Sequence, residues 1–270
     1  MIGTLSNARA APQGPPYSYP GRSFERLSMP NTPARDLGWG LFVIQILSIM
    51  FVYLVSGIPA IAIWGDSSTG AAASVASSMA GALLLAWFWL RREGAVAKAW
   101  NLSPPPNIPV TLSYGILATI AIIGWFSLGS ILVESIGLSN PDVAQVLGWA
   151  TQSQFHFILW IVLVAVFAAG IGEELMWRGF LMDRLERLSG LRGRAWLVIL
   201  VQGLLFGLPH LYQGLGGVII TAFVGFGFGW LRYRCGGNLW ACIIAHIAVD
   251  TIMLSLAYAQ SLGMIPEISA

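Results

Sequence analysis

The fold class is decided by residues 157–177, which read FILWIVLVAVFAAGIGEELMW. An uncharged, mainly apolar run leads up to two adjacent carboxylates, Glu173 and Glu174. A helix needs about 20 mostly apolar residues to cross a hydrocarbon layer ~30 Å thick, because each residue rises ~1.5 Å. This stretch is therefore typical of a membrane-spanning helix that carries acidic groups near one end.

Six further stretches of the same kind lie on either side of it, at residues 40–64, 71–90, 110–133, 195–211, 218–231 and 239–259. Together they predict an all-α, polytopic transmembrane bundle of about seven spans, with eight as the alternative. The stretch at 218–231 is short, which indicates a tilted or partly re-entrant segment.

The overall composition supports a membrane protein. Of the 270 residues, 56% are apolar and 10% are charged, against roughly 45–50% and about 25% in soluble domains. These proportions argue against a soluble enzyme and against a disordered chain. The 2 cysteines and the net charge of +2 argue against a disulfide scaffold and a nucleic-acid binder.

Positive charges predict the orientation, because Lys and Arg are enriched in cytoplasmic loops. If the N-terminal tail is cytoplasmic and seven spans alternate, they fall on one side, at Arg9, Arg22, Arg26, Arg35, Arg91, Arg92, Lys98, Arg184, Arg187, Arg192, Arg194, Arg232 and Arg234. The opposite connections carry acidic residues only, namely Asp66, Glu134, Asp142 and Glu267. We therefore predict a multi-pass plasma membrane protein with a cytoplasmic N-terminus and an external C-terminus.

Ionisable residues within the spans are the main functional candidates, because each costs about 2.5–3.5 kcal/mol at mid-bilayer if unpaired. They occur only in the C-terminal half, where the pairs Glu174–Arg178, Phe206–His210 and His246–Asp250 are each four residues apart. Such pairs share one face of a helix. Glu174 and Arg178 can neutralise each other as an ion pair. Glu173 points elsewhere and has no partner on its own helix.

Glu173, His210 and His246 are expected at one depth, nearer the cytoplasmic face. The midpoint of the first two falls in the turn 189–194, so an antiparallel hairpin places them level with each other. The charged residues before that turn, Asp183, Arg184, Glu186 and Arg187, are expected to protrude into the cytoplasm as a solvated turn. An alternative is that the hairpin 182–194 helps to admit substrate.

Three motifs on successive apolar segments resemble those of the CPBP family, which groups type II CAAX prenyl endopeptidases with bacteriocin-processing and self-immunity proteins. They are Glu173-Glu174-x-x-x-Arg178, Phe206-x-x-x-His210 and His246-x-x-x-Asp250, and they match EExxxR, FxxxH and HxxxN/D. The resemblance covers roughly residues 155–255. It divides the chain into a Pro/Arg-rich cytoplasmic tail (1–38), N-terminal transmembrane helices (39–150), a catalytic transmembrane core (151–260) and a C-terminal tail (261–270).

The resemblance implies an intramembrane glutamic endopeptidase with its active site open to the cytosol. Carried over by position, Glu173 is the general base that activates water, and His210 helps to hold that water. His246 and Asp250 stabilise the oxyanion, while Glu174, Arg178 and Phe206 shape the site. One departure puts the role of position 250 in doubt: the prenyl-processing enzymes usually have Asn there, and a carboxylate donates a hydrogen bond only when protonated. Asp250 can instead orient His246 and keep it charged.

Other functions remain open at this stage. Glu and His are also zinc ligands, so a zinc-dependent protease is an alternative to the expected enzyme without metal or other cofactor. A non-catalytic scaffold or immunity protein and a proton-coupled carrier are further alternatives. The expected partners are the lipid bilayer and a membrane-associated substrate, either a prenylated CAAX protein, a peptide leader or another membrane protein. Nucleic acid is not expected, and the oligomeric state is open.

Overall fold

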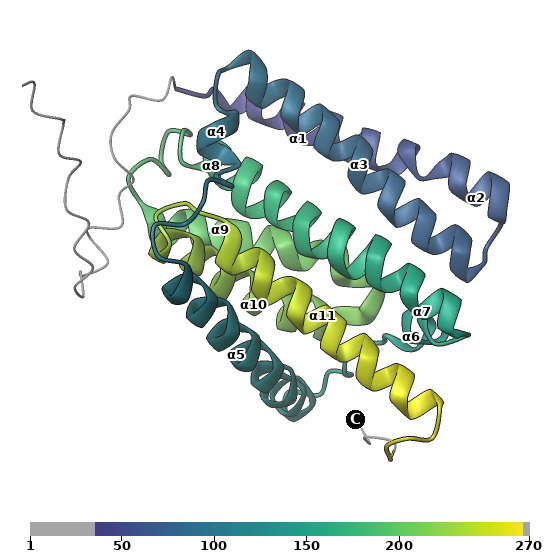
Figure 1. Cartoon of the computed structure of the whole chain (residues 1–270). Coiled ribbons are helices and arrows are strands. Elements are labelled where there is room, and N and C mark those ends of the chain that lie inside the picture. Colours follow the sequence, from purple (N-terminus) through teal and green to yellow (C-terminus); the bar gives the residue numbers. More distant parts are fainter. Residues whose placement is uncertain (1–35, 267–270) are drawn as a thin grey trace, which may run out of the picture.

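A computed structural model of the chain describes residues 36–266, which form helices and loops with no strand (Figure 1). Most of the predicted tail 1–38 and the end of the tail 261–270 lie outside the described residues. The helices are α1 (Trp39–Ser56), α2 (Ile58–Trp64), α3 (Ser68–Arg92), α4 (Val96–Ala99), α5 (Ile108–Ser135), α6 (Ala144–Ala150), α7 (Gln154–Trp160), η2 (Ile161–Leu181), α8 (Met182–Leu185), α9 (Ala195–Gly207), η3 (Leu208–Gln213), α10 (Gly214–Arg234) and α11 (Trp240–Ser261). The all-α prediction is confirmed.

Six helical segments within residues 36–266 are long and apolar enough to cross a membrane, namely Trp39–Trp64, Ser68–Arg92, Ile108–Ser135, Gln154–Leu185, Ala195–Arg234 and Trp240–Ser261. The polytopic bundle is thus confirmed. The predicted spans 195–211 and 218–231 both fall within Ala195–Arg234.

The segment Ala195–Arg234 reverses direction part-way, so it contains two antiparallel helices, α9 and α10. A Cβ added at Gly203 would meet Phe226, and one added at Gly207 would meet Ala222, so contacts move backward along α10 as α9 advances. The reversal occurs at Gly214, whose φ of +86° suits glycine best. The second arm is longer than the predicted 14-residue span, because α10 has 21 residues.

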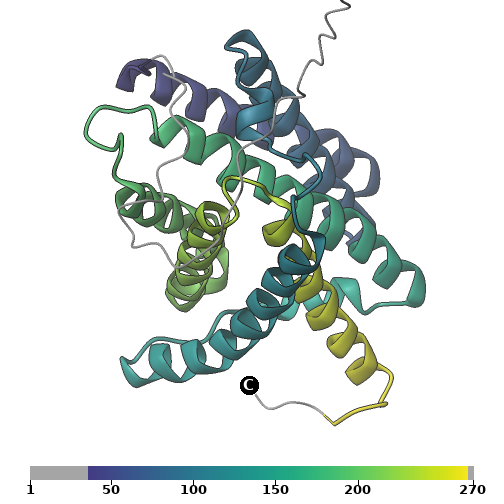
Figure 2. The ribbon, with the colours of Figure 1, turned by 60° about the vertical axis from the view of Figure 1, so that its left-hand side comes forward.

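Two central helices, η2 and α11, pack along each other and are enclosed by the others. The α1–α3 pair packs against η2 through α3, and α5 packs against α11 and α10. The α9–α10 hairpin occupies a third side of the bundle (Figure 2). Every predicted site residue therefore lies on the two central helices or on the segment from α9 to η3.

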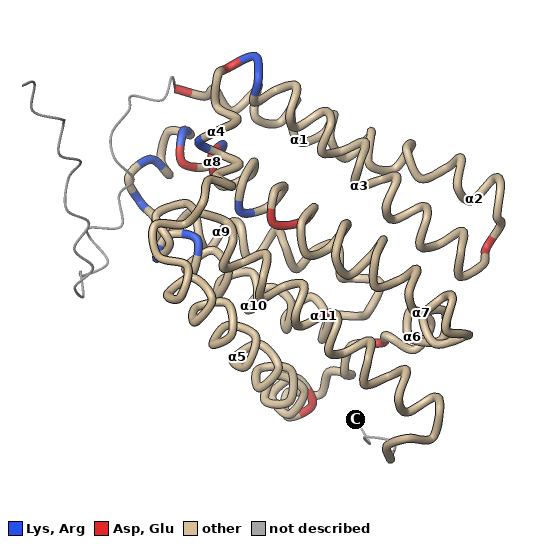
Figure 3. The backbone as a smooth tube through the Cα atoms, in the orientation of Figure 1, with Lys and Arg blue, Asp and Glu red and all other residues tan. Residues whose placement is uncertain are grey.

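The described Lys and Arg residues gather toward one end of the bundle, where α1 begins (Figure 3). The acidic residues Asp66, Glu134 and Asp142 lie toward other ends of the helices, in the connections after α2 and α5. This separation is the one that the positive-inside rule requires. Arg9, Arg22, Arg26, Arg35 and Glu267 lie outside the described residues.

The prediction of a solvated charged turn is wrong for most of its residues. Asp183, Arg184 and Arg187 are 1%, 0% and 6% exposed. Glu93, in the connection after α3, accepts a hydrogen bond from Arg184 at 2.5 Å and another from Arg187. Charges are buried without prohibitive cost only when they are paired, and a partner from the N-terminal half supplies that pairing. Spacing within one segment could not reveal it.

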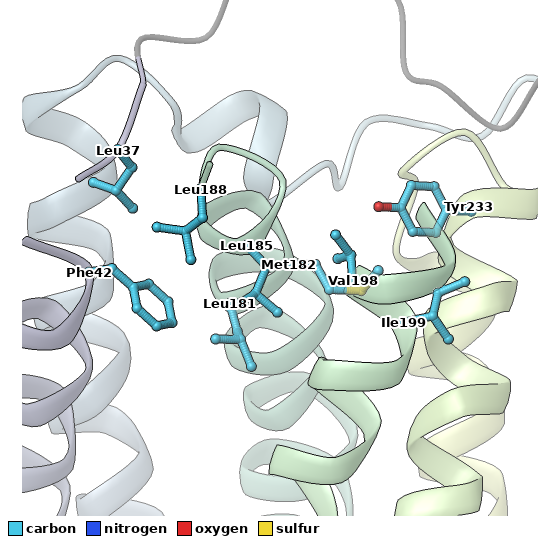
Figure 4. Close-up of a cluster of buried hydrophobic side chains, with 9 residues drawn as sticks. All are labelled: Leu37, Phe42, Leu181, Met182, Leu185, Leu188, Val198, Ile199 and Tyr233. Atoms are coloured by element: carbon cyan, nitrogen blue, oxygen red, sulfur yellow. The ribbon is translucent and has the colours of Figure 1, made fainter. Parts of the chain in front are cut away.

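An apolar cluster beside this ionic network joins the first helix to the C-terminal half (Figure 4). Leu37 and Phe42, at the start of the chain's described part, pack near side chains of η2, α8 and the loop that follows. Val198, Ile199 and Tyr233 extend the cluster to the α9–α10 hairpin. The charged end of the bundle is therefore the place where both halves of the chain are fixed together.

Candidate active site

The helix η2 carries the two carboxylates and is wound with π-type turns from Ile161 to Leu181. Such i→i+5 turns are rare and often occur at functional sites, whereas the sequence spacing predicts an ordinary α-helix. Gly170 permits the close approach of α11, because a Cβ there would lie 2.2 Å from Cγ1 of Ile247. The glycine before the carboxylates therefore serves helix packing.

Glu174 is the centre of a buried ionic cluster. Its Oε1 accepts a hydrogen bond from Nη1 of Arg178 at 3.0 Å and lies 2.7 Å from Nδ1 of His246. The Glu174 and Arg178 side chains are both 0% exposed. The predicted ion pair between these two residues is present, but its link to His246 was not foreseen.

Aromatic rings surround the Arg178 guanidinium. Its central carbon lies 4.1 Å from the ring centroid of Phe206 and 4.7 Å from that of Phe228. The ring of Phe228 also stacks on His246, with centroids 5.4 Å apart. Phe206 was among the predicted site-shaping residues. Phe228 was missed, because an aromatic residue in an apolar span of α10 has no distinguishing pattern in the sequence.

Glu173 lies on the open side of the cluster. Its Oε2 is 4.0 Å from Nε2 of His246, and its side chain is 25% exposed. Asp250 approaches the same nitrogen, with Oδ2 at 3.8 Å and a side chain 32% exposed. Within residues 36–266 Glu173 makes no hydrogen bond, so both oxygens of this carboxylate can accept one from water or substrate.

His210 belongs to the short 3-10 helix η3, since α9 ends at Gly207 and not near residue 211 as predicted. Pro209 lacks the N–H that would continue the α-helical pattern. Nδ1 of His210 lies 3.2 Å from the carbonyl oxygen of Phe206, so in the neutral ring this nitrogen carries the hydrogen and Nε2 is free to accept one.

The predicted meeting of three polar residues is present between Glu173 and His246. His210 is within electrostatic range of His246 and Arg178, but in the described part of the chain no direct contact joins it to Glu173. The arrangement has a buried layer of Glu174, Arg178 and His246. Glu173 and Asp250 lie on its open side.

The donor groups do not form a cation site. Among residues 36–266, no group of three or more His, Cys, Asp or Glu side chains is placed to hold a metal ion. Nδ1 of His246 is already engaged by Glu174. The set of donors in this geometry therefore does not fit zinc, for which four tetrahedral ligands are usual.

Comparison with protein families identifies this part of the chain. Residues 155–252 match the family described as type II CAAX prenyl endopeptidase Rce1-like. These residues form an Rce1-like region. No curated protein and no solved structure matched the chain.

The Rce1-like region begins in α7 and ends in α11, so it contains all seven predicted site residues. The family indicates CAAX-type intramembrane protease activity, in agreement with the resemblance seen in the motifs. The helices α1 to α6 lie outside the matched residues. The N-terminal half nevertheless contributes Glu93 to the ionic network, and it contributes Leu37 and Phe42 to the apolar cluster.

Proposed function

We propose that this protein is an intramembrane glutamic-type endopeptidase in which Glu173 activates a water molecule to hydrolyse a peptide bond. The observation that carries the proposal is the contrast between two adjacent carboxylates. Glu174 is buried and held by Arg178 and His246. Glu173 is partly exposed and 4.0 Å from Nε2 of the same histidine. A carboxylate that is accessible and unpaired by hydrogen bonds is suited to general base catalysis.

The proposed reaction needs only groups of this chain and one water. Glu173 accepts a proton from the water, whose oxygen attacks the carbonyl carbon of the scissile bond. Nε2 of a protonated His246 donates a hydrogen bond to the resulting oxyanion, and the site excludes bulk water, which strengthens that bond. When the C–N bond breaks, Glu173 returns its proton to the leaving amine. His210, with Nε2 free to accept, holds the water before attack.

Glu174 and Arg178 act through His246. The contact with Glu174 fixes the imidazole so that Nδ1 faces the buried layer and Nε2 faces Glu173. Arg178 neutralises much of the Glu174 charge. A carboxylate that orients a histidine in this way holds one tautomer and one ring orientation.

The proposed location is the plasma membrane, with the active site open to the cytosol. The gathering of Lys and Arg at one end of the bundle supports this orientation. The proposed substrate is a membrane-associated protein or peptide, with prenylated CAAX proteins as the class that the matched family suggests. We propose that catalysis needs no metal.

Comparative peptidomics of membranes tests the proposal and does not require an identified substrate. Peptides released by the wild type should be lost with Glu173→Gln and strongly reduced with His210→Ala. Asp66→Asn is the matched control, because Asp66 is an exposed carboxylate after α2. A peptide pattern unchanged by both site variants would refute the protease and favour a scaffold. A carrier would instead move solute in response to a pH gradient.

A further inference from the structure

The proposed reaction lacks a second donor for the oxyanion, and this inference rests on that proposed function. Asp250 offers only acceptor atoms when ionised. Its Oδ2 lies 3.8 Å from Nε2 of His246, so it accompanies that nitrogen without adding a donor. Tetrahedral intermediates of acyl transfer are commonly held by more than one donor. A neutral hydroxyl near both carboxylates would supply the missing one.

Tyr212 is placed to do so. It follows His210 by two residues in η3, and the two rings stack with centroids 6.3 Å apart and planes 26° apart. The residue is 66% exposed, so its hydroxyl is accessible from outside the helix bundle. The charges of Glu173 and Asp250 both act on this phenol. Tyr212 therefore lies on the open side of the site, beside the proposed base.

A neighbouring side chain leaves the Tyr212 hydrogen available. Nε2 of Gln213 donates to the hydroxyl oxygen of Tyr212 at 2.8 Å. The oxygen is thus an acceptor in this bond, and its own hydrogen remains free to be donated. A hydroxyl that accepts one hydrogen bond is polarised and donates the next one more strongly.

We propose that Tyr212 is a further catalytic residue, whose hydroxyl donates a hydrogen bond to the oxyanion in the place where an Asn at position 250 would do so. His246 and Tyr212 then form a two-donor oxyanion site contributed by α11 and η3. The hydroxyl only donates a hydrogen bond, so its proton is not transferred. Asp250 is left to balance the charge of His246.

Tyr53 is the other phenol near the site and serves as a competing assignment. It lies on α1, and the charges of Glu173 and Tyr212 act on it. Asp250 marks the side where the oxyanion would lie. Within the described residues its charge acts on Tyr212 and is not among those that act on Tyr53. A comparison of the two Tyr→Phe variants therefore separates the two assignments.

The test measures release of the Glu173-dependent peptides, and then kcat and KM for the most abundant of their precursors. Tyr212→Phe should lower kcat by about 10²-fold with KM little changed, as loss of one oxyanion donor does. Tyr258→Phe is the matched control, because this ring stacks on Phe157 at the far end of α11, and it should keep wild-type kinetics. Adding Asp250→Asn to Tyr212→Phe should recover part of kcat, since an amide restores a donor.

The outcomes are distinguishable. A Tyr212→Phe enzyme within about threefold of the wild type, beside an inactive Glu173→Gln enzyme, overturns the role of Tyr212 and leaves the proposed function intact. Loss of kcat in Tyr53→Phe alone overturns it in favour of Tyr53. Identical peptide release by the wild type and Glu173→Gln refutes the protease, and the oxyanion site with it.

Discussion

Oε1 of Glu174 lies 2.7 Å from Nδ1 of His246, although the two residues are 72 positions apart in the chain. The contact joins η2 to α11 and also includes Arg178, whose Nη1 donates to the same oxygen. Because Nδ1 is engaged, only Nε2 of the imidazole faces Glu173 and Asp250. The relation between the two motifs therefore sets which atom of His246 is available for chemistry.

Glu174→Gln should destabilise the protein and reduce its activity. The variant leaves Arg178 as a fully buried charge without its partner, and breaking a buried pair typically costs about 3–5 kcal/mol. Thermal unfolding in detergent, followed by tryptophan fluorescence, measures the effect. Asp66→Asn is the control at an exposed position and should unfold like the wild type. A Glu174→Gln protein as stable as this control would contradict the role of the cluster.

The α9–α10 hairpin should tolerate no side chain at Gly225. A Cβ there would lie 2.9 Å from Cα of Gly203, so the helix backbones would have to separate. Gly225→Ala should therefore cost about 1–3 kcal/mol and lower activity by shifting Phe206 and His210. Gly227→Ala is the matched control two residues away, because nothing lies within 4 Å of the added Cβ. Equal stability of the two variants would show that the hairpin is packed differently.

Glu93→Gln should lower stability near neutral pH, and the loss should shrink in acid. Burial alone would raise the pKa of the Glu93 carboxyl, but hydrogen bonds and charges from Arg187 and Arg184 outweigh it and hold the pKa below its ordinary value of 4.5. Because the folded pKa is lower than the unfolded one, the carboxylate stabilises the fold fully above about pH 4.5 and loses this effect as pH falls through the folded pKa.

Thermal midpoints of the wild type and Glu93→Gln, measured from pH 7 down to pH 3, check this prediction. The gap between the two curves should narrow toward the acid end. Glu134→Gln, at an exposed carboxylate near the end of α5, serves as the control. A gap that stays constant across this range would mean that Glu93 acts by packing alone.

Much of the architecture could be predicted because membrane spans are determined by local hydrophobicity. The i,i+4 pair of Glu174 and Arg178 is likewise a local feature and was predicted correctly. The burial of Arg184 and Arg187 was not, because their partner Glu93 is more than 90 residues away. Phe228 and the end of α9 at Gly207 were missed for the same reason: their roles depend on neighbouring helices and on the hairpin reversal.

Cysteine accessibility should show which end of the bundle faces the cytosol. In a variant without native cysteines, Ser135→Cys should react with a membrane-impermeant maleimide on intact cells, because it ends α5 at the acidic side. Ser189→Cys, exposed in the cationic turn, should react only after the membrane is permeabilised. The reverse pattern would place the active site toward the outside of the cell.

The central claim, that Glu173 activates water for peptide hydrolysis, is tested most directly by single-turnover cleavage in H2(18)O. The assay uses purified protein in vesicles, treated with a strong chelator and shown to be free of zinc. We predict that the wild type places one 18O atom in the new carboxyl terminus at its full rate, and that Glu173→Gln forms no product above background. Cleavage by Glu173→Gln at the wild-type rate, or loss of wild-type cleavage on chelation, would contradict the account.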